Sequence, residues 1–370
     1  MKRMAMLVLA ICALLSTMAA GAAAEREIVA RTAVTKWGQL PQAFEVTGQA
    51  LPEGVLASDF TIAGEATAWG AASLHPFSCG VDAVEATDGG WRLVPERFPD
   101  KYFYVRRLEV SCPGHPELGF TLEDISRTIT PTADEFETLE DPQAQLSAHV
   151  FLPEAQGPCP VVVVFHGYGD TENLLTYRTA VIWAEPGNQA VRPCAVIAPT
   201  IPDALYTSEY VRNGVFEKVL AWVDEQAAAG RVDPKRIYVM GNSFGGMSAF
   251  EMAELYPDRV AAVLALCPAL NYSAHGSRRL GELTGVPVTI CQAEHDETIP
   301  VQVGQAAART LVDAGNPDVT LRVYSDEEMI AAGAALGSEN TYSFHHVELA
   351  AMEGYEFEGY ARWLFEQVKE

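Results

Sequence analysis

The sequence predicts a small β-sandwich followed by an α/β domain in which helices cover a mostly parallel sheet. Three observations lead to this expectation. The chain has 370 residues, 49% of them hydrophobic, which is enough for two packed cores. Short alternating runs separated by Gly and Pro fill the first third. Over the remainder, apolar strand-like runs alternate with helix-like segments, which is typical of α/β folds.

The first 24 residues have the pattern of a secretory signal peptide. Lys2 and Arg3 precede an apolar stretch at residues 5–15, and residues 22–24 are a small-residue cleavage site. This stretch is too short for a stable membrane span. We therefore expect a secreted or periplasmic protein without stable membrane insertion, whose mature chain starts at Glu25.

The net charge argues against two classes of partner. It is -24 at pH 7 for the whole sequence, and loss of Lys2 and Arg3 makes it more negative still. A strongly acidic surface repels nucleic acids and anionic membranes, so we expect neither as a partner. The composition leaves the oligomeric state open.

Residues 25–130 are predicted to form the β-sandwich. Alternating runs such as 44–47, 91–94 and 102–110 are separated by turn residues. Three tryptophans in this region are either core residues or stacking faces for a carbohydrate, and core burial is the commoner fate of single tryptophans. They are Trp37, Trp69 and Trp91.

Six cysteines remain after removal of the signal peptide. An even number in an exported chain suggests disulfides. The alternative for each cysteine is a buried free thiol. The candidate pairs are Cys79 with Cys112, Cys159 with Cys194, and Cys267 with Cys291.

Residues 131–370 are predicted to form the catalytic α/β domain, after an acidic link that covers residues 126–145. Its strands and helices follow from the apolar patterning. We expect strands at 148–152, 159–165, 194–198, 237–240, 260–266, 286–291 and 319–324, and helices at 215–226, 247–255, 301–314 and 347–369.

A nucleophile motif, G-x-S-x-G, lies at the junction of a predicted strand and a predicted helix. Ser243 occupies its centre, between Gly241 and Gly245. The turn that joins strand and helix is so sharp that only residues without bulky side chains fit two positions before and after the serine. We therefore predict Ser243 as the nucleophile, with the backbone amide of Phe244 facing the position where an oxyanion forms.

A serine nucleophile needs a base and an acid that orients the base. Asp296 follows a predicted strand and is favoured as the acid over Glu294 and Glu297, which are read as loop charges. His345 and His346 are the only histidines after Asp296, and the residue pattern by itself leaves both open as the base.

A second glycine-rich loop, His166-Gly-Tyr-Gly-Asp170, follows the strand predicted at 159–165. Its glycines let the backbone approach a substrate, so the amide of Tyr168 is predicted to complete the oxyanion hole. His166 is expected to brace the loop. No His, Cys or carboxylate cluster has metal-ligand spacing in the sequence, and we expect neither a metal nor a cofactor.

Three blocks resemble the α/β-hydrolase superfamily, in particular its prolyl-oligopeptidase-like branch of secreted esterases and polyhydroxybutyrate-depolymerase-like proteins. They are residues 166–170, 232–246 and 295–300. The resemblance implies an α/β-hydrolase fold with Ser243 and Asp296 in the triad, and an immunoglobulin-like (Ig-like) N-terminal domain. The spacing of the last block favours His345 over His346, although Phe344 and Glu348 depart from the family pattern and residues 326–341 are an acidic insertion.

The predicted activity is hydrolysis of carboxylic esters by a Ser-His-Asp triad, with short acyl groups or acetyl and feruloyl groups of polysaccharide as substrates. Four tyrosines near the catalytic edge are candidates for lining the acyl pocket. A serine peptidase of the prolyl-oligopeptidase-like type is the alternative, and an inactive binding module is the second alternative. The tyrosines are Tyr168, Tyr177, Tyr206 and Tyr210.

Overall fold

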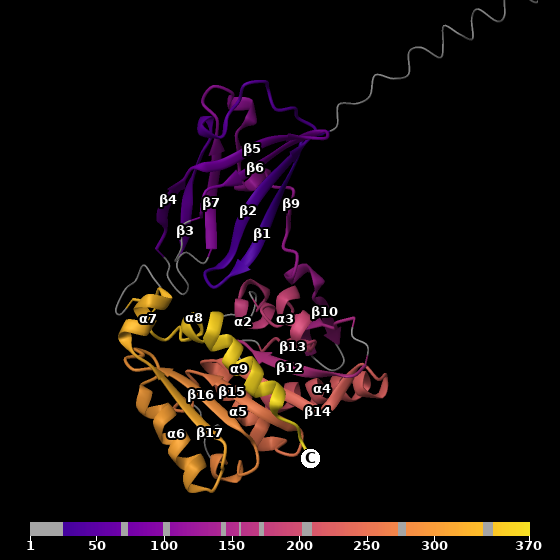
Figure 1. Ribbon diagram of the computed structural model, residues 1–370, viewed down its shortest axis with the longest axis vertical. Coiled ribbons are helices and arrows are strands. Elements are labelled where there is room, and N and C mark those ends of the chain that lie inside the picture. Colours follow the sequence, from indigo (N-terminus) through magenta and orange to yellow (C-terminus); the bar gives the residue numbers. More distant parts are fainter. Residues whose placement is uncertain are drawn as a thin grey trace, which may run out of the picture.

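The computed structural model describes residues 25–67, 73–98, 104–141, 146–154, 157–169, 174–201, 209–272, 279–335 and 343–370. Within them the chain forms two lobes, which lie one above the other in Figure 1. The N-terminal lobe contains two β-sheets, and the C-terminal lobe contains one large sheet with helices. The predicted signal peptide lies outside the described residues.

The N-terminal lobe has a five-stranded sheet in the order β5-β6-β2-β1-β9 and a four-stranded sheet in the order β4-β3-β7-β8. All described pairs are antiparallel except β1 with β9. The strands are β1 (Glu27–Thr35), β2 (Gly38–Thr47), β3 (Thr61–Thr67), β4 (His75–Cys79), β5 (Val81–Thr87), β6 (Gly90–Pro95), β7 (Tyr104–Ser111), β8 (Phe120–Thr121) and β9 (Arg127–Ile129).

Aromatic side chains fill the space between these two sheets. The rings of Phe44 on β2 and Phe120 on β8 lie 5.2 Å apart, and those of Phe60 and Trp91 lie 5.5 Å apart. Trp91 is fully buried and Trp37 is 6% exposed, so neither ring offers a stacking face to a carbohydrate. Trp69 lies outside the described residues.

The large sheet has the strand order β10-β11-β13-β12-β14-β15-β16-β17. From β13 to β17 all neighbours run parallel, and β10 and β11 extend one edge antiparallel. The predicted mostly parallel sheet is confirmed. Its strands are β10 (Glu137–Asp141), β11 (Leu146–Phe151), β12 (Cys159–Phe165), β13 (Ala195–Pro199), β14 (Val232–Asn242), β15 (Val260–Leu266), β16 (Val288–Ala293) and β17 (Val319–Tyr324).

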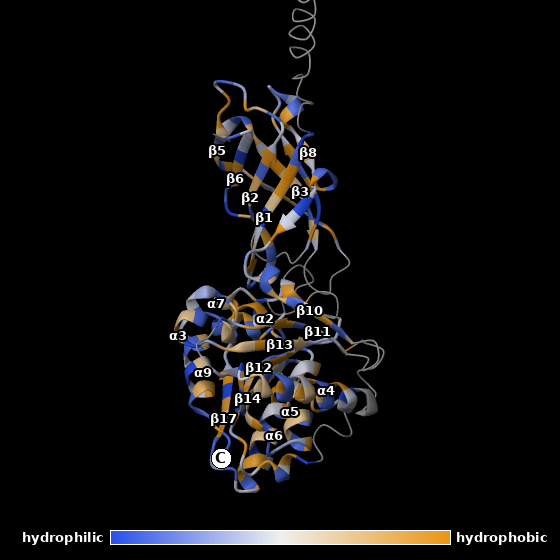
Figure 2. Ribbon diagram, turned by 90° about the vertical axis from the view of Figure 1, so that its right-hand side faces the viewer, coloured by the Kyte–Doolittle hydropathy of each residue, from blue (hydrophilic) through white to orange (hydrophobic). Residues whose placement is uncertain are grey.

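Helices cover both faces of this sheet. Buried residues of α4, α5 and α6 pack on one face, and those of α9 pack on the other. Figure 2 shows the sheet between α4, α5 and α6 on one side and α3 and α9 on the other. The described helices are α2 (Arg178–Val181), α3 (Pro186–Val191), α4 (Glu209–Ala228), α5 (Phe244–Leu255), α6 (Val301–Asp313), α7 (Asp326–Ala332), α8 (Glu348–Ala351) and α9 (Gly354–Glu366).

Three segments differ from the sequence prediction. The expected link at 126–145 contains β9, which pairs with β1, and β10, the edge strand of the large sheet. The helix expected over 347–369 is interrupted after residue 351 and divides into α8 and α9. The acidic insertion contains α7, which begins with a reciprocal cap between Ser325 and Glu328 and is capped at its C-terminal end by Gly333.

All six described cysteines are free thiols, so the predicted disulfides are wrong. Cys79 and Cys112 lie on opposite sides of β3, because Ile62 pairs with Cys79 in β4 and with Val110 in β7. Because β3 lies between them, β4 and β7 are two strand spacings apart, which is about 9–10 Å. Since a disulfide requires Cα atoms within about 7 Å, this pair cannot form one without backbone movement.

The register of the large sheet separates the second pair. Val161 is level with Ala195, so Cys159 and Cys194 are offset by one residue. Side chains alternate between the faces of a strand, and the two thiols therefore belong to the cores on opposite faces.

In the third pair, Cys267 directly follows β15 and Cys291 lies on the adjacent strand β16. The Cys267 amide donates to the Cys291 carbonyl at 2.8 Å. Each thiol has another partner. The Cys267 thiol donates to the His345 carbonyl at 3.2 Å, and the Cys291 thiol is hydrogen-bonded with Tyr360.

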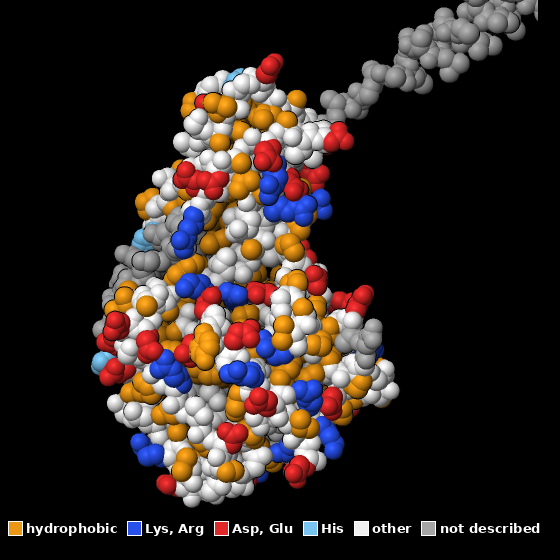
Figure 3. All heavy atoms as spheres, in the orientation of Figure 1, with side chains coloured by type: hydrophobic (Ala, Val, Ile, Leu, Met, Phe, Trp, Pro, Cys, Tyr) orange, Lys and Arg blue, Asp and Glu red, His pale blue; other side chains and the backbone are white. Residues whose placement is uncertain are grey.

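One hydrophobic core extends through both lobes. It includes Phe44 and Trp91 between the N-terminal sheets, Trp37 at the tip of the β1–β2 hairpin, and Phe344 and Leu349 of the C-terminal lobe. On the face drawn in Figure 3, basic and acidic side chains are interspersed on both lobes and along their junction. Among the described helices, none combines the length and the apolar character that a membrane span requires.

Candidate active site

Ser243 occupies a sharp turn between β14 and α5. Its backbone has φ 55° and ψ -118°, a strained conformation for a residue with a side chain. A Cβ atom at Gly241 would lie 2.4 Å from the Phe165 carbonyl oxygen, and one at Gly245 would lie 2.1 Å from it. Glycine is therefore required at both positions, as the motif predicts.

The backbone of Ser243 is tied to the end of the neighbouring strand, β15. Its amide donates to the Leu266 carbonyl at 2.9 Å, and its carbonyl accepts from the Ala269 amide at 3.0 Å. The side chain lies at the carboxyl edge of the parallel strands, where catalytic residues of open α/β sheets gather. Ser243 is 9% exposed, so the surrounding structure shields most of it from solvent.

Asp296 lies in the loop after β16 and is fixed by backbone donors. Its Oδ1 accepts hydrogen bonds from the amides of Thr298 and Ile299, both at 2.8 Å. The Gln292 side chain donates to Oδ2 at 3.3 Å. These donors hold the carboxylate in one orientation.

His345 is the histidine that meets Asp296. Its Nδ1 lies 2.9 Å from Asp296 Oδ2 and 3.1 Å from Oδ1. An Nδ1 proton donated to this carboxylate leaves Nε2 as the basic nitrogen, which is the tautomer that a serine base requires. His346 instead pairs through Nδ1 with Glu348 at 2.8 Å.

The competing carboxylates are engaged elsewhere. Glu297 accepts a hydrogen bond from the Phe344 amide at 3.1 Å, next to the histidines, and so helps to fix this segment of the chain. Glu294 is exposed and lies beside His295. Of the three carboxylates considered from the sequence, Asp296 is the one in hydrogen-bond contact with His345.

The surroundings of His345 raise its pKa. Burial by itself lowers the pKa of His345, whereas the adjacent Cys267 thiol and Asp296 carboxylate raise it, and the net direction is upward. Burial also raises the pKa of Cys267, so that thiol stays neutral near pH 7. The Asp296 carboxylate is therefore the group that stabilises an imidazolium at His345.

The glycine-rich loop after β12 lies beside the elbow. His166 is buried and uses both ring nitrogens, since Nδ1 donates to the Gly167 carbonyl at 2.7 Å and Nε2 accepts from the Ile201 amide at 2.9 Å. This histidine braces the loop. The next residues include Tyr168, whose ring lies 5.8 Å from that of Phe244. The two residues predicted to donate oxyanion amides are thus neighbours.

A third aromatic side chain extends this contact. The ring of Tyr272 lies 5.7 Å from that of Phe244, so Tyr168, Phe244 and Tyr272 form a row with the residue next to the nucleophile at its centre. We call these three residues the aromatic row. Tyr168 and Tyr272 are 55% and 59% exposed, so both rings on either side of Phe244 are open to solvent.

Tyr272 was not predicted from the sequence, although its position six residues after the end of the buried strand β15 was an available signal. Of the other tyrosines considered, Tyr177 instead lines a small cleft with β1–β2 hairpin residues. Tyr206 and the side chain of Tyr210 lie outside the described residues.

Two groups of potential metal ligands occur among the described residues, each with ligand atoms within 4.8 Å of one another. Cys267, Asp296 and His345 form the buried group, whose contacts are given above. The exposed group consists of Glu294, His295 and Asp326. Its members were missed from the sequence because Asp326 is 31 residues from His295. Within it, the Asp326 hydrogen bond raises the pKa of His295.

Comparisons with known proteins agree with this fold. Residues 202–332 match the family model described as phospholipase/carboxylesterase, a segment that contains Ser243 and Asp296 but not His345. No curated protein sequence matches the chain. The solved structure of a thermostable esterase has 20% sequence identity and a TM-score of 0.69, over 92% of this chain and 99% of that one. This overlap extends through both lobes and shows a common fold.

Two other esterase structures overlap with about two thirds of the chain. Est1E from Butyrivibrio proteoclasticus is 16% identical, with a TM-score of 0.44, over 63% of this chain and 98% of its own. A thermophilic esterase from Thermogutta terrifontis is 18% identical, with a TM-score of 0.43, over 64% and 94% respectively. The family match indicates an enzyme of the carboxylesterase kind.

Proposed function

We propose that this protein is an exported serine esterase that hydrolyses carboxylic esters through Ser243, His345 and Asp296. The observation that carries the proposal is the 2.9 Å contact of His345 with Asp296, together with a serine in a strained elbow between two obligatory glycines. The end of β15 links the two, because the Ser243 amide donates to the Leu266 carbonyl and the next residue, Cys267, donates to the His345 carbonyl. This combination supports the proposal of an oriented base that serves a nucleophile held at the same sheet edge.

In the proposed reaction, His345 Nε2 accepts the hydroxyl proton of Ser243 while the serine oxygen attacks the ester carbonyl carbon. The negative oxygen of the tetrahedral intermediate is stabilised by the backbone amides of Tyr168 and Phe244. His345 then gives the proton to the leaving alcohol, and an acyl-enzyme remains. In the second half, His345 Nε2 takes a proton from water while the water oxygen attacks the acyl carbon. The bond to Ser243 Oγ then breaks, Oγ receives the proton from His345, and the carboxylic acid is released. Asp296 stabilises the imidazolium in both halves.

For the substrate we propose esters of short or planar aromatic acyl groups, including acetyl and feruloyl groups linked to polysaccharide. The aromatic row supports this choice. Exposed rings beside a nucleophile offer faces and edges on which a flat acyl group stacks, and such contacts contribute about 0.5–1.5 kcal/mol each. A short acyl group needs no enclosed tunnel.

We also propose that the N-terminal lobe is an Ig-like domain over residues 25–130, that 131–370 form the catalytic domain, and that residues 1–24 direct export. The pattern of Lys2 and Arg3, an apolar stretch and Ala22-Ala23-Ala24 supports export. Mass spectrometry of the exported protein tests the last point, since a mature chain that keeps Lys2 and Arg3 contradicts it.

The activity is tested with p-nitrophenyl esters from acetyl to palmitoyl and with peptide p-nitroanilides. We expect turnover of short esters that falls by about 10³-fold or more in Ser243→Ala and His345→Ala. His346→Asn is the matched control and should retain activity within about tenfold. Ester turnover that survives in Ser243→Ala refutes the proposal, and turnover of the anilides alone favours a peptidase.

A further inference from the structure

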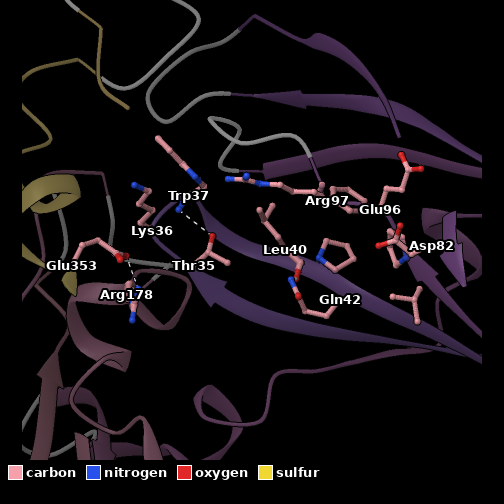
Figure 4. A pocket seen from close by; sticks show the side chains of 14 residues that line it. Thr35, Lys36, Trp37, Leu40, Gln42, Asp82, Glu96, Arg97, Arg178 and Glu353 are labelled. Atoms are coloured by element: carbon pink, nitrogen blue, oxygen red, sulfur yellow. Dashed lines mark hydrogen bonds and ion pairs between the residues drawn. The ribbon is translucent and has the colours of Figure 1, made fainter. Parts of the chain in front are cut away.

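The tip of the β1–β2 hairpin is the part of the N-terminal lobe that reaches the segment carrying His345. In Figure 1 the hairpin points down onto the C-terminal lobe above α2 and α8. The turn is shaped by its own hydrogen bonds, since the Trp37 amide donates to Thr35 Oγ1 at 3.1 Å and this hydroxyl donates to the Gly38 carbonyl at 2.9 Å. The Lys36 and Trp37 side chains project from this turn, as Figure 4 shows.

Both side chains contact the C-terminal end of α7. Lys36 Nζ donates to the Ala332 carbonyl at 3.1 Å. The Trp37 ring lies against Gly333, where a Cβ atom would be 2.2 Å from Cη2 of the indole. Gly333 has φ 102°, so glycine is needed there for the backbone as well as for the ring. Trp37 is 6% exposed in this position.

The same turn also lies against α8. Thr35, Lys36 and Gly38 line a small cleft together with Leu349 and Met352. Beside it, Arg178 of α2 forms an ion pair with Glu353 at 2.5 Å, which Figure 4 shows below the hairpin. A cavity of about 560 Å³ adjoins this pair, between the lobes, so the hairpin tip reaches the C-terminal lobe at the edge of an open space.

The catalytic histidine lies between these two contacts in the chain. α7 ends at Ala332, α8 begins at Glu348, and His345 is on the connection that joins them. Phe344 and Val347, on either side of the histidines, are buried in the same core as Trp37. The hairpin therefore contacts the end of α7 and also α8, which begins three residues after His345.

We propose that Trp37 and Lys36 are positioning residues for His345, and that the N-terminal lobe thereby forms part of the support of the active site. This inference rests on the proposed function of His345 as the base. Displacement of a catalytic group by about 1 Å can cost 10²-fold in rate. Loss of the Trp37 ring removes its packing against Gly333 at the end of α7 and lets the segment that carries His345 shift.

The test compares Trp37→Ala, Trp37→Phe and Lys36→Met with the wild type at a temperature where circular dichroism shows each to be folded. We expect Trp37→Ala to lower kcat for p-nitrophenyl acetate by about tenfold or more with KM within about twofold. Trp37→Phe, which keeps an aromatic ring at this position, should retain most of the wild-type kcat. In Trp37→Ala, the pH at which labelling of Ser243 by a fluorophosphonate is half-maximal should move toward the pKa of an isolated histidine.

Two controls separate positioning from general destabilisation. Trp91→Phe weakens the core of the same lobe far from the hairpin tip, and Lys369→Met removes a lysine that likewise donates to a backbone carbonyl at 3.1 Å, that of Gly285. Both should keep the wild-type kcat. If Trp37→Ala and Lys36→Met keep kcat within twofold, or if Trp91→Phe lowers it equally, the inference is overturned.

The labelling arm distinguishes this inference from the proposed function. A wild type that reacts with fluorophosphonate but turns over no ester refutes the substrate proposal, and the labelling rates of the Trp37 variants still decide the positioning role. A wild type that fails to react has no activated serine, and the inference then falls with it. If Trp37→Ala does not fold, the kcat of Lys36→Met is compared with that of Lys369→Met. A lower kcat in Lys36→Met alone supports the inference, and equal values overturn it.

Discussion

His345 Nδ1 and Asp296 Oδ2 lie 2.9 Å apart, although 49 residues separate them in the chain. The carboxylate raises the pKa of His345 against the effect of burial. Because His345 must be neutral to accept a proton, activity should rise with pH, and the rise should come above the ordinary histidine value of about 6.5. The raised pKa also stabilises the fold below about pH 6.5, and this contribution is lost as the pH rises through the folded-state value.

Asp296→Asn should therefore change both rate and pH profile. We expect kcat to fall by about 10³-fold or more, because the amide cannot stabilise an imidazolium and favours the wrong tautomer. The midpoint of the residual rate should move to lower pH. Rate measurements between pH 5 and 9 check this. Glu294→Gln, which removes an exposed carboxylate of the same loop, is the matched control. An unmoved midpoint in Asp296→Asn contradicts the role of Asp296.

Gly245→Ala should strongly reduce activity. The added methyl group would lie 2.1 Å from the Phe165 carbonyl oxygen, so β12 or the elbow must move. We expect a kcat loss of about 10²-fold or more and a destabilisation of about 1–3 kcal/mol. Denaturant titration and ester assays measure both. Gly214→Ala in α4, where a Cβ atom meets nothing within 4 Å, should be neutral or slightly stabilising.

Tyr272→Ala should change selectivity rather than chemistry. If flat acyl groups stack on the aromatic row, kcat/KM for a feruloyl ester should fall about 3- to 10-fold relative to that for an acetyl ester. Tyr355→Ala removes a tyrosine that is 86% exposed on α9 and should leave the ratio unchanged. Equal losses for both esters would rule out stacking on Tyr272.

Glu254→Gln should stabilise the protein in a pH-dependent manner. Burial, and then the nearby Glu251, raise the pKa of Glu254 from 4.5 to about 8. Below pH 4.5 the carboxyl is protonated in both states. Between 4.5 and 8 the unfolded chain ionises first, so the wild type loses stability over this window.

The Tm difference between Glu254→Gln and wild type should therefore grow from pH 4.5 to pH 8. Thermal unfolding at several pH values measures it. Glu366→Gln, on the exposed surface of α9, controls for the loss of one negative charge. A Tm difference that is constant from pH 4 to 8 would show that Glu254 ionises normally.

The sequence was most informative where the chemistry is local. Gly241, Ser243 and Gly245 define the elbow within five residues, and the strand before them and the helix after them are strongly apolar. Asp296 could be predicted for the same reason, since it closely follows a buried strand. His345 and His346 could not be separated from the residue pattern alone, because the choice depends on which ring faces a distant carboxylate.

The cysteines show why register is harder to predict than secondary structure. The segment at Cys159 was correctly predicted as a strand, and Cys194 immediately precedes another. Their side chains nevertheless point to opposite faces because the strands are offset by one residue, a quantity that depends on the packing of the whole sheet. The docking of Trp37 on Gly333 is a contact of the same long-range kind.

The contact between Lys36 and Ala332 joins positions 296 residues apart, and this distance matters while the protein is being made. At about 5–20 residues per second, a ribosome needs about 15–60 s to travel from one to the other. During that interval the indole of the nascent hairpin has no surface to cover it, and it offers chaperones or other chains a place to bind. The lobe that is synthesised first thus completes its packing only when one of the last helices arrives.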